Sequence, residues 1–331
     1  MPDLSTRYMK LDLRSPIIVA SCGLTGKLEN LLLAEKHGAG AVVMKSIFEE
    51  HIKYEIHKTL PSATGANYYP EAEAYISKYA EIYSLDSYLK LISEAKKRLS
   101  IPLIASINCV TSHEWTDFAC RIQDAGADAL ELNIFLLPSN HHYSSEQNEQ
   151  FYFDIVREVR KNISIPIAVK TSYYFSGLAK MALKLSWTGI EGIVMFNRFF
   201  APDIDIDNFT ITPAYVFSRP EDMVTSLRWV AVLSDRLHCD IAASTGIHDG
   251  AAAIKQLLAG AKAVQIASIL YKKGFEYIPV MLNDIETWMN KHEFNNLNDF
   301  IGKMSYANIE NPASYLRIQF MKNFSDISDV E

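Results

Sequence analysis

ISIPIAVK (163–170) and AGADALELN (125–133) are the segments that decide the fold of this chain. Each joins a short lead-in to an apolar run that ends on a polar side chain. Both kinds recur, the first as LSIPLIAS (99–106) and the second as HGAGAVVMK (37–45), TGIEGIVMFN (188–197) and AGAKAVQIA (259–267). Short apolar runs between stretches of helical length are typical of parallel strands that are buried on both faces. The pattern therefore predicts repeated βα units.

Eight such runs give eight predicted strands. They lie near residues 16–21, 41–45, 102–107, 129–133, 166–171, 192–197, 240–244 and 263–267. Eight βα units favour closure into an α/β (β/α)8 TIM barrel, and the G-x-G-x-x-G turn of an open doubly wound sheet is missing after the first run. We expect a single domain over 1–331, with the barrel at about 14–290 and a helical extension at about 291–331.

Two predicted connections are too long for simple turns. Residues 46–84 follow the second strand and residues 198–221 follow the sixth. Long loops in a compact domain are usually functional, which makes both candidate lids. Within the second, DIDID (203–207) predicts a short exposed strand; it is not a calcium loop, because Asn208 and Ala214 replace the glycine and glutamate that such a loop needs.

The composition is that of a globular protein that binds a small molecule. The net charge of −7 and pI near 5.8 disfavour nucleic acid and anionic membranes as partners. No long apolar segment indicates a signal peptide or a membrane span, so we expect a cytoplasmic protein. The four cysteines form no CxxC pair, which predicts neither disulfides nor a metal site.

Polar side chains lie where the predicted strands end. They are Lys45, Asn108, Asn133, Lys170, Asn197 and the triplet Ser244–Gly246. One such lysine could simply extend along the barrel rim with its ammonium in water. Together, however, these side chains predict a pocket, because the active sites of barrels lie at the carboxyl ends of the strands.

ASTGI (243–247) adds a candidate phosphate site. Its turn and the following helix can direct free backbone N–H groups at a phosphate, and the turn after the eighth strand nominates Ala267 and Ser268 as the other half. The alternative is an ordinary tight turn in which Ser or Thr caps the helix.

A family resemblance follows from the order and spacing of these motifs. ASCG (20–23), KS (45–46), LELN (130–133), VKTSYYF (169–175), FN (196–197), STGI (244–247) and QIAS (265–268) together resemble the dihydroorotate dehydrogenases over about residues 10–290. The resemblance implies an FMN-dependent oxidoreductase that converts dihydroorotate to orotate in pyrimidine synthesis, or acts on a related small planar substrate. It also implies a homodimer.

The resemblance assigns roles to individual residues. It places FMN against Ala20, Ser21, Lys45, Ser46, Asn133, Lys170 and Phe196 around the rings, and against Thr245, Gly246, Ala267 and Ser268 around the phosphate. It places the substrate against Asn133, Asn140 and Asn197. Lys45, Asn133 and Ser139 are the candidate catalytic residues.

The sequence departs from the family where the substrate should react. The soluble class has a cysteine base in the loop after the fourth strand, and here Leu136 and Leu137 stand in its place. A leucine accepts no proton, so the base is Ser139, one of His141, His142 and Tyr143, or the reaction differs. The family's loop N-S-M-G is missing from SATGANYYP (62–70), and Arg198 replaces the serine after Asn197.

Three functions therefore stay open. The first is the FMN oxidoreductase. The second is a degenerate, non-catalytic flavin-binding barrel, which the missing base favours. The third is a lyase or aldolase barrel in which Lys170 forms a Schiff base. The tyrosines Tyr68, Tyr69, Tyr173 and Tyr174 either shape a lid over the pocket or serve packing alone.

Overall fold

The computed structural model describes residues 1–48, 85–109, 115–134, 136–199 and 201–316. The segment 62–70, with Tyr68 and Tyr69, lies outside the described residues, as does most of the first long connection.

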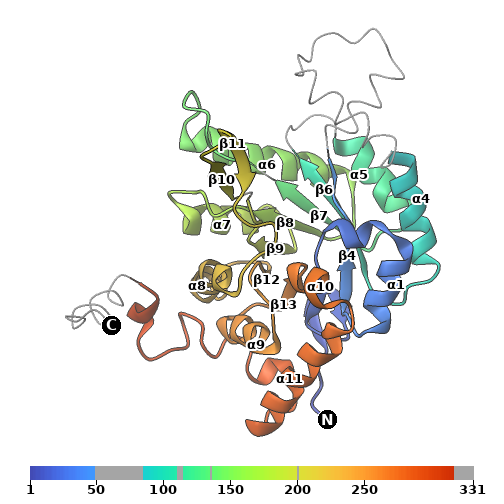
Figure 1. Ribbon diagram of the computed structural model, residues 1–331, viewed down its shortest axis with the longest axis vertical. Coiled ribbons are helices and arrows are strands. Elements are labelled where there is room, and N and C mark those ends of the chain that lie inside the picture. The colour runs from blue at the N-terminus through green and yellow to red at the C-terminus, as the bar shows by residue number, and fades with distance from the viewer. Residues whose placement is uncertain (49–84, 110–114, 135, 200, 317–331) are drawn as a thin grey trace.

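A closed ring of parallel strands forms the centre of the molecule and confirms the predicted (β/α)8 TIM barrel (Figure 1). Each predicted run contains one strand: β3 (Ile17–Val19), β4 (Ala41–Val43), β6 (Leu103–Cys109), β7 (Ala129–Ile134), β8 (Ile167–Thr171), β9 (Gly192–Met195), β12 (Asp240–Ser244) and β13 (Ala263–Ile266). Pairing of β4 with β6 closes the ring. A short strand, β5 (Ile47–Phe48), prolongs the line of β4 and pairs with β6.

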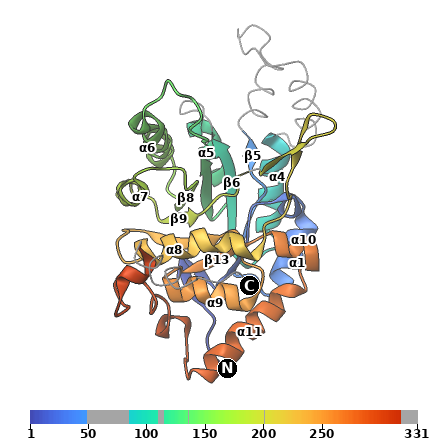
Figure 2. The ribbon, with the colours of Figure 1, turned by 60° about the vertical axis from the view of Figure 1, so that its left-hand side comes forward.

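Helices surround the ring, as Figures 1 and 2 show. They are α1 (Leu28–Lys36), α4 (Leu85–Lys96), α5 (Trp115–Asp124), α6 (Ser145–Asn162), α7 (Leu178–Ser186), α8 (Met223–Leu233), α9 (Gly250–Ala259), α10 (Ser268–Lys273) and α11 (Tyr277–Lys291). Their apolar faces pack on the strands and form one large core with them. None of the described helices is long and apolar enough to cross a membrane.

The helical extension expected at about 291–331 stays a prediction, because residues 317–331 lie outside the described part of the chain. The described residues after α11, up to residue 316, contain two 3₁₀ turns, η3 (Leu297–Asp299) and η4 (Pro312–Tyr315), and no α-helix. The side chain of Phe300 is fully buried against the core, which fixes this segment on the barrel.

The connection after β9 forms an antiparallel hairpin of β10 (Pro202–Asp205) and β11 (Thr210–Pro213). The strand predicted at 203–207 is therefore present but ends at Asp205. The Asp205 carboxylate accepts hydrogen bonds from the backbone N–H groups of Asp207 and Asn208, which turns the chain.

A second hairpin, β1 (Thr6–Tyr8) and β2 (Leu11–Leu13), closes the amino-terminal end of the ring. Tyr8, at the end of β1, and Met9, in the turn, are fully buried in a cluster of apolar side chains from the barrel strands. Gly192 makes room for them, since a Cβ there would lie 2.8 Å from the Tyr8 hydroxyl and 2.9 Å from Met9 Cγ.

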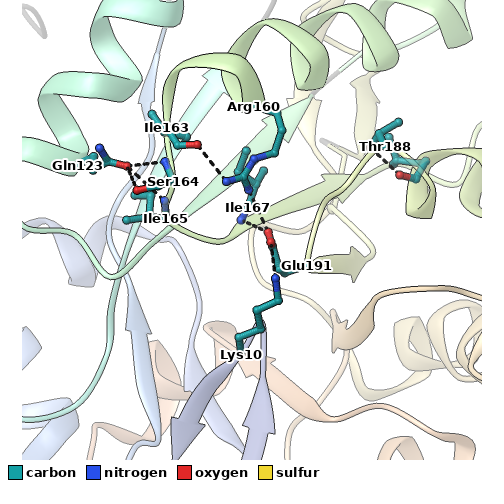
Figure 3. A network of polar contacts seen from close by, with 10 residues as sticks. Lys10, Gln123, Arg160, Ile163, Ser164, Ile165, Ile167, Thr188 and Glu191 are labelled. Atoms are coloured by element: carbon teal, nitrogen blue, oxygen red, sulfur yellow. Dashed lines mark hydrogen bonds and ion pairs between the residues drawn. The ribbon is translucent and has the colours of Figure 1, made fainter.

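Glu191 ties this hairpin to the barrel (Figure 3). Its carboxylate accepts hydrogen bonds from Lys10 Nζ at 3.0 Å, from Arg160 on α6 at 3.2 Å and from the Ile167 N–H at the start of β8 at 2.8 Å. One half-buried acid thus joins three elements at the end of the barrel opposite the predicted pocket.

Candidate functional site

A cavity of about 470 Å³ opens at the carboxyl ends of the strands. Its lining includes many of the residues predicted from the sequence: Ala20, Ser21, Lys170, Phe196, Asn197, Thr245, Gly246, Ala267 and Ser268. These residues come from β3, β8, β9, β12 and β13 or from the turns that follow them. Parallel strands end at one edge of a barrel, which brings residues that are distant in the sequence to one mouth.

Three other predicted site residues are not part of the cavity lining. Asn133 accepts a hydrogen bond from the amide of Asn197 at 2.6 Å, so it orients a residue that lines the cavity. Ser46 bonds to Ser21 at 2.9 Å. Lys45 is half-buried at the end of β4 and does not line the cavity.

The loop after β7 lies apart from the cavity. Ser139, Asn140, His141 and His142 are all exposed, and none of them lines a described cavity. The Asn140 side chain accepts from the His142 N–H at 3.0 Å, which stabilises a turn. The structure therefore does not bring the predicted base and one predicted substrate ligand to the other site residues.

Lys170 is anchored in the cavity wall by a buried polar network. Its ammonium donates to Gln265 Oε1 at 3.0 Å and lies 3.7 Å from Glu131 Oε1. Gln265 Nε2 in turn donates to Glu131 Oε2 at 2.5 Å. All three residues are at least nine-tenths buried, with exposures of 6% for Lys170, 2% for Gln265 and 1% for Glu131. The acid compensates the charge of the lysine inside the barrel.

Two members of this network were missed in the sequence. Glu131 lies inside the apolar run ALELN and Gln265 inside AVQIA, so each is a polar residue within a buried strand. Such residues need partners on neighbouring strands, and this is the signal that could have identified them.

A chain of hydroxyls supports the wall formed by β3. Ser21 bonds to Ser46, and Ser46 bonds to Ser106 at 2.7 Å. The backbone of Ser106 exchanges two hydrogen bonds with the Tyr88 hydroxyl, at 2.9 and 3.1 Å. Burial raises the pKa of Tyr88, which keeps this phenol neutral. This series of hydrogen bonds ends at the buried Tyr88. Its role is therefore to hold the side chains of Ser21 and Ser46 in place.

The turn after β12 has the left-handed conformation, with φ of 75° at Thr245 and 77° at Gly246. A Cβ on Gly246 would lie 2.2 Å from the backbone nitrogen of Met223, so this glycine permits close packing against the start of α8. The Thr245 hydroxyl donates to the Phe196 carbonyl at 3.1 Å and links the ends of β12 and β9.

The helix expected to face a phosphate is already capped. Asp249 is the N-cap of α9, and its carboxylate accepts from the Ala252 N–H at 2.7 Å. A carboxylate at this terminus leaves the Thr245–Gly246 turn and the Ala267–Ser268 turn as the parts of the predicted phosphate site that line the cavity.

The loop before α8 contacts this part of the cavity through Ser218. Ser218 donates its N–H to the Ser268 hydroxyl at 3.0 Å, its own hydroxyl bonds to His248 Nε2 at 2.9 Å, and its carbonyl accepts from Lys272 at 3.2 Å. Burial, with Lys272 nearby, lowers the pKa of His248, which favours the neutral imidazole. His248 directly follows STGI and could have been suspected from the sequence, whereas nothing marked Ser218.

A second cavity of about 260 Å³ adjoins the first and shares Phe196, Asn197 and Arg198 with it. Tyr173 and Tyr174 line this second cavity. Arg198 donates to the carbonyls of Tyr215 and Val216 and lies over the Tyr215 ring. The arginine thus holds the loop after β11 against the end of β9.

Comparison with known proteins gives a consistent result. Residues 80–289 match the family model for dihydroorotate dehydrogenase. The catalytic subunit of dihydroorotate dehydrogenase B (NAD(+)) from Thermoplasma acidophilum is 28% identical over 314 residues, covering 91% of this chain and 99% of the relative. The protein of the same name from Pyrococcus horikoshii is 27% identical over 313 residues, covering 90% of this chain and 97% of the relative.

Proposed function

The chain belongs to the dihydroorotate dehydrogenase family and is an oxidoreductase of that type, and we propose that it works with FMN bound in the 470 Å³ cavity. The observation that carries this proposal is the charge-compensated Lys170 in a cavity wall that also includes hydroxyls and a tight backbone turn. The volume lies within the range of sites for cofactor-sized ligands, about 300–1,000 Å³.

The residues present fit the two ends of FMN. Lys170 has three donors, and among the described residues only Gln265 accepts from it, so N–H groups remain for the ring edge that becomes negative on reduction. Ser218, Ser268 and the turn at Thr245 supply hydroxyl and N–H donors for the phosphate. Bound FMN would supply the hydride acceptor, while the protein orients the substrate and takes up its proton.

Asn197 is the proposed substrate contact in the cavity lining, and Asn133 behind it orients its amide. Their amides are held in register by the bond at 2.6 Å, which presents a fixed pattern of donors and acceptors to a planar substrate such as dihydroorotate. Asn197→Ala should raise KM for dihydroorotate and leave FMN binding intact.

Ser139 stays the proposed proton acceptor, although it is exposed in a loop that lies apart from the cavity, so this role requires the loop to approach the bound substrate. It stands in the loop where the family carries its base, and among the described residues no side chain or backbone group bonds its hydroxyl. Ser139→Ala should reduce turnover of dihydroorotate by about 100-fold or more with FMN uptake unchanged. Equal turnover would move the role to His141, His142 or Tyr143.

The decisive experiment is spectroscopic. The purified protein should be yellow, release FMN on denaturation and bleach when dihydroorotate is added without oxygen. A protein that takes up no added FMN refutes the cofactor. One that holds FMN but is bleached by no pyrimidine or dihydropyrimidine is the non-catalytic barrel.

The Schiff-base alternative is less well supported by the site. A Schiff-base lysine must offer its nitrogen lone pair to a carbonyl carbon, whereas Lys170 Nζ donates to Gln265 Oε1 at 3.0 Å and is ion-paired with Glu131 at 3.7 Å. Borohydride with a carbonyl substrate should therefore leave Lys170 unmodified.

A homodimer is the proposed assembly, formed through the β10–β11 hairpin. Ile204 and Ile211 pair across it and are 67% and 74% exposed, and Phe209 at its turn is 89% exposed. A second copy would cover this apolar surface. Light scattering should show a dimer for the wild type and for Asp203→Lys, and a monomer for Ile204→Lys. A dimeric Ile204→Lys would place the interface elsewhere.

A further inference from the structure

Gln265 separates two opposite charges that would otherwise meet. Its amide lies between Lys170 and Glu131, accepting from the lysine at 3.0 Å and donating to the acid at 2.5 Å. The nitrogen of Lys170 and Glu131 Oε1 stay 3.7 Å apart, which is too long for a hydrogen bond. Glu131 Oε1 is buried and has no hydrogen-bond partner among the described residues.

This arrangement is not the one that the pair would adopt alone. A buried ammonium and a buried carboxylate attract strongly, and a direct charge-assisted bond at about 2.7–2.9 Å would satisfy the orphan oxygen. The amide bridges the pair with one hydrogen bond to each partner, and the remaining approach of Lys170 Nζ to Glu131 Oε1 stays at 3.7 Å. Its orientation is fixed, since only its oxygen can accept from Lys170 and only its nitrogen can donate to Glu131.

The position of Gln265 matters for the cavity. Lys170 and Gln265 both line it, whereas Glu131 lies behind them. Closure of the direct ion pair would draw the ammonium toward Glu131 and away from the cavity. The remaining N–H groups of the lysine would then turn from a ligand in the cavity to the acid.

We propose that Gln265 is a positioning residue, a spacer that keeps the Lys170 ammonium facing the cavity and thereby sets how strongly it stabilises negative charge on the bound cofactor. This rests on the proposed FMN site. Glu131 supplies the compensating charge, and Gln265 keeps that charge at a distance.

The test is the reduction potential of protein-bound FMN, measured by equilibration with a reference dye, in four variants. Gln265→Met keeps the length of the side chain and removes both hydrogen bonds. It should weaken stabilisation of reduced FMN about tenfold, which lowers the potential by about 30 mV for a two-electron couple.

Glu131→Gln should act in the opposite direction. It removes the negative charge behind the lysine and should raise the potential. The double variant E131Q/Q265M has no acid to draw the lysine back, so its potential should equal or exceed that of the wild type. E131Q/K170M, which lacks both charges, gives the value without the lysine and should be the lowest.

Loss of packing alone would not move the two single variants in opposite directions. An unchanged or raised potential in Gln265→Met, or a double variant as low as Gln265→Met, overturns the spacer. If Gln265→Met does not fold, Glu131→Gln decides, and a potential at or below that of the wild type overturns the proposal. Failure of the wild type to take up FMN would instead refute the proposed function and this inference with it.

Discussion

The two ends of the barrel are built from the same strands and yet differ in chemistry. At the amino-terminal end, Tyr8 and Met9 of the β1–β2 hairpin fill the interior against alanines and β-branched residues, and the outer edge is tied down by Glu191. At the carboxyl end the interior holds Glu131, Gln265 and Lys170 and opens into a cavity. One end is a packed plug that provides stability, and the other carries buried charge for a ligand.

The largest expected effect comes from removing the cation of the buried polar network at the carboxyl end of the barrel. Lys170→Met leaves the Glu131 carboxylate buried without its cation and should destabilise the fold by about 3–5 kcal/mol. It should also weaken FMN binding about tenfold or more, because a charged donor is lost. Urea unfolding and FMN fluorescence titration measure the two effects.

The double variant E131Q/K170M separates the effect on stability from the effect on FMN binding. It should recover most of the stability while FMN binding stays weak. Recovery of both would show that the lysine contributes only as the partner of Glu131.

A substitution in the β1–β2 hairpin, the packed plug, should change the stability of the protein and not its FMN affinity. Tyr8→Ala removes a fully buried ring and should cost about 3–5 kcal/mol in unfolding free energy, with FMN affinity of the folded protein unchanged. Tyr8→Phe is the matched control. The Tyr8 hydroxyl is buried with no hydrogen-bond partner among the described residues, so its removal should be neutral or stabilising. A changed FMN affinity in Tyr8→Ala would show that the two ends are coupled.

A smaller loss is expected at the turn after β12. Gly246→Ala adds a Cβ that would lie 2.2 Å from Met223 N, at a φ of 77°. Overpacking of this kind costs about 1–3 kcal/mol, and the turn must shift to relieve it. FMN affinity should fall as well, since Gly246 lines the cavity. An affinity equal to that of the wild type would argue against a phosphate at this turn.

The smallest expected effect is a pH dependence from His248. Burial lowers its pKa in the folded state, so the unfolded chain binds the proton more readily. Stability from the neutral imidazole is therefore present above its unfolded pKa of about 6.5 and is lost as the pH falls below that value.

Thermal unfolding at about pH 7.5 and about pH 5.5 measures this loss, and His248→Gln should reduce the difference between the two Tm values. An equal difference in the variant would assign the pH dependence to other groups.

Local pattern was sufficient to predict the barrel. Apolar runs of strand length, all but DIAAS (240–244) with a glycine or proline in the lead-in, identified every barrel strand within the described residues. The plug was missed because TRYMKLDL (6–13) is too short to show a period, and its burial depends on Gly192, far along the chain.

The candidate site was predicted in part for the same reason. Residues at strand ends, such as Lys170 and Thr245, could be placed from the sequence because strand direction alone fixes where they lie. Ser218 could not, since its place depends on how a long loop crosses the barrel to meet His248 and Ser268.

The sequence by itself determined the parallel barrel, the end of it that carries polar residues, and the family resemblance. Those properties follow from residue order and period. Only the tertiary structure decided that Gln265 separates Lys170 from Glu131, that Asp249 occupies the terminus of α9, and that Ser139 is exposed. Each of these depends on distances between side chains from separate strands and loops, which local sequence does not encode.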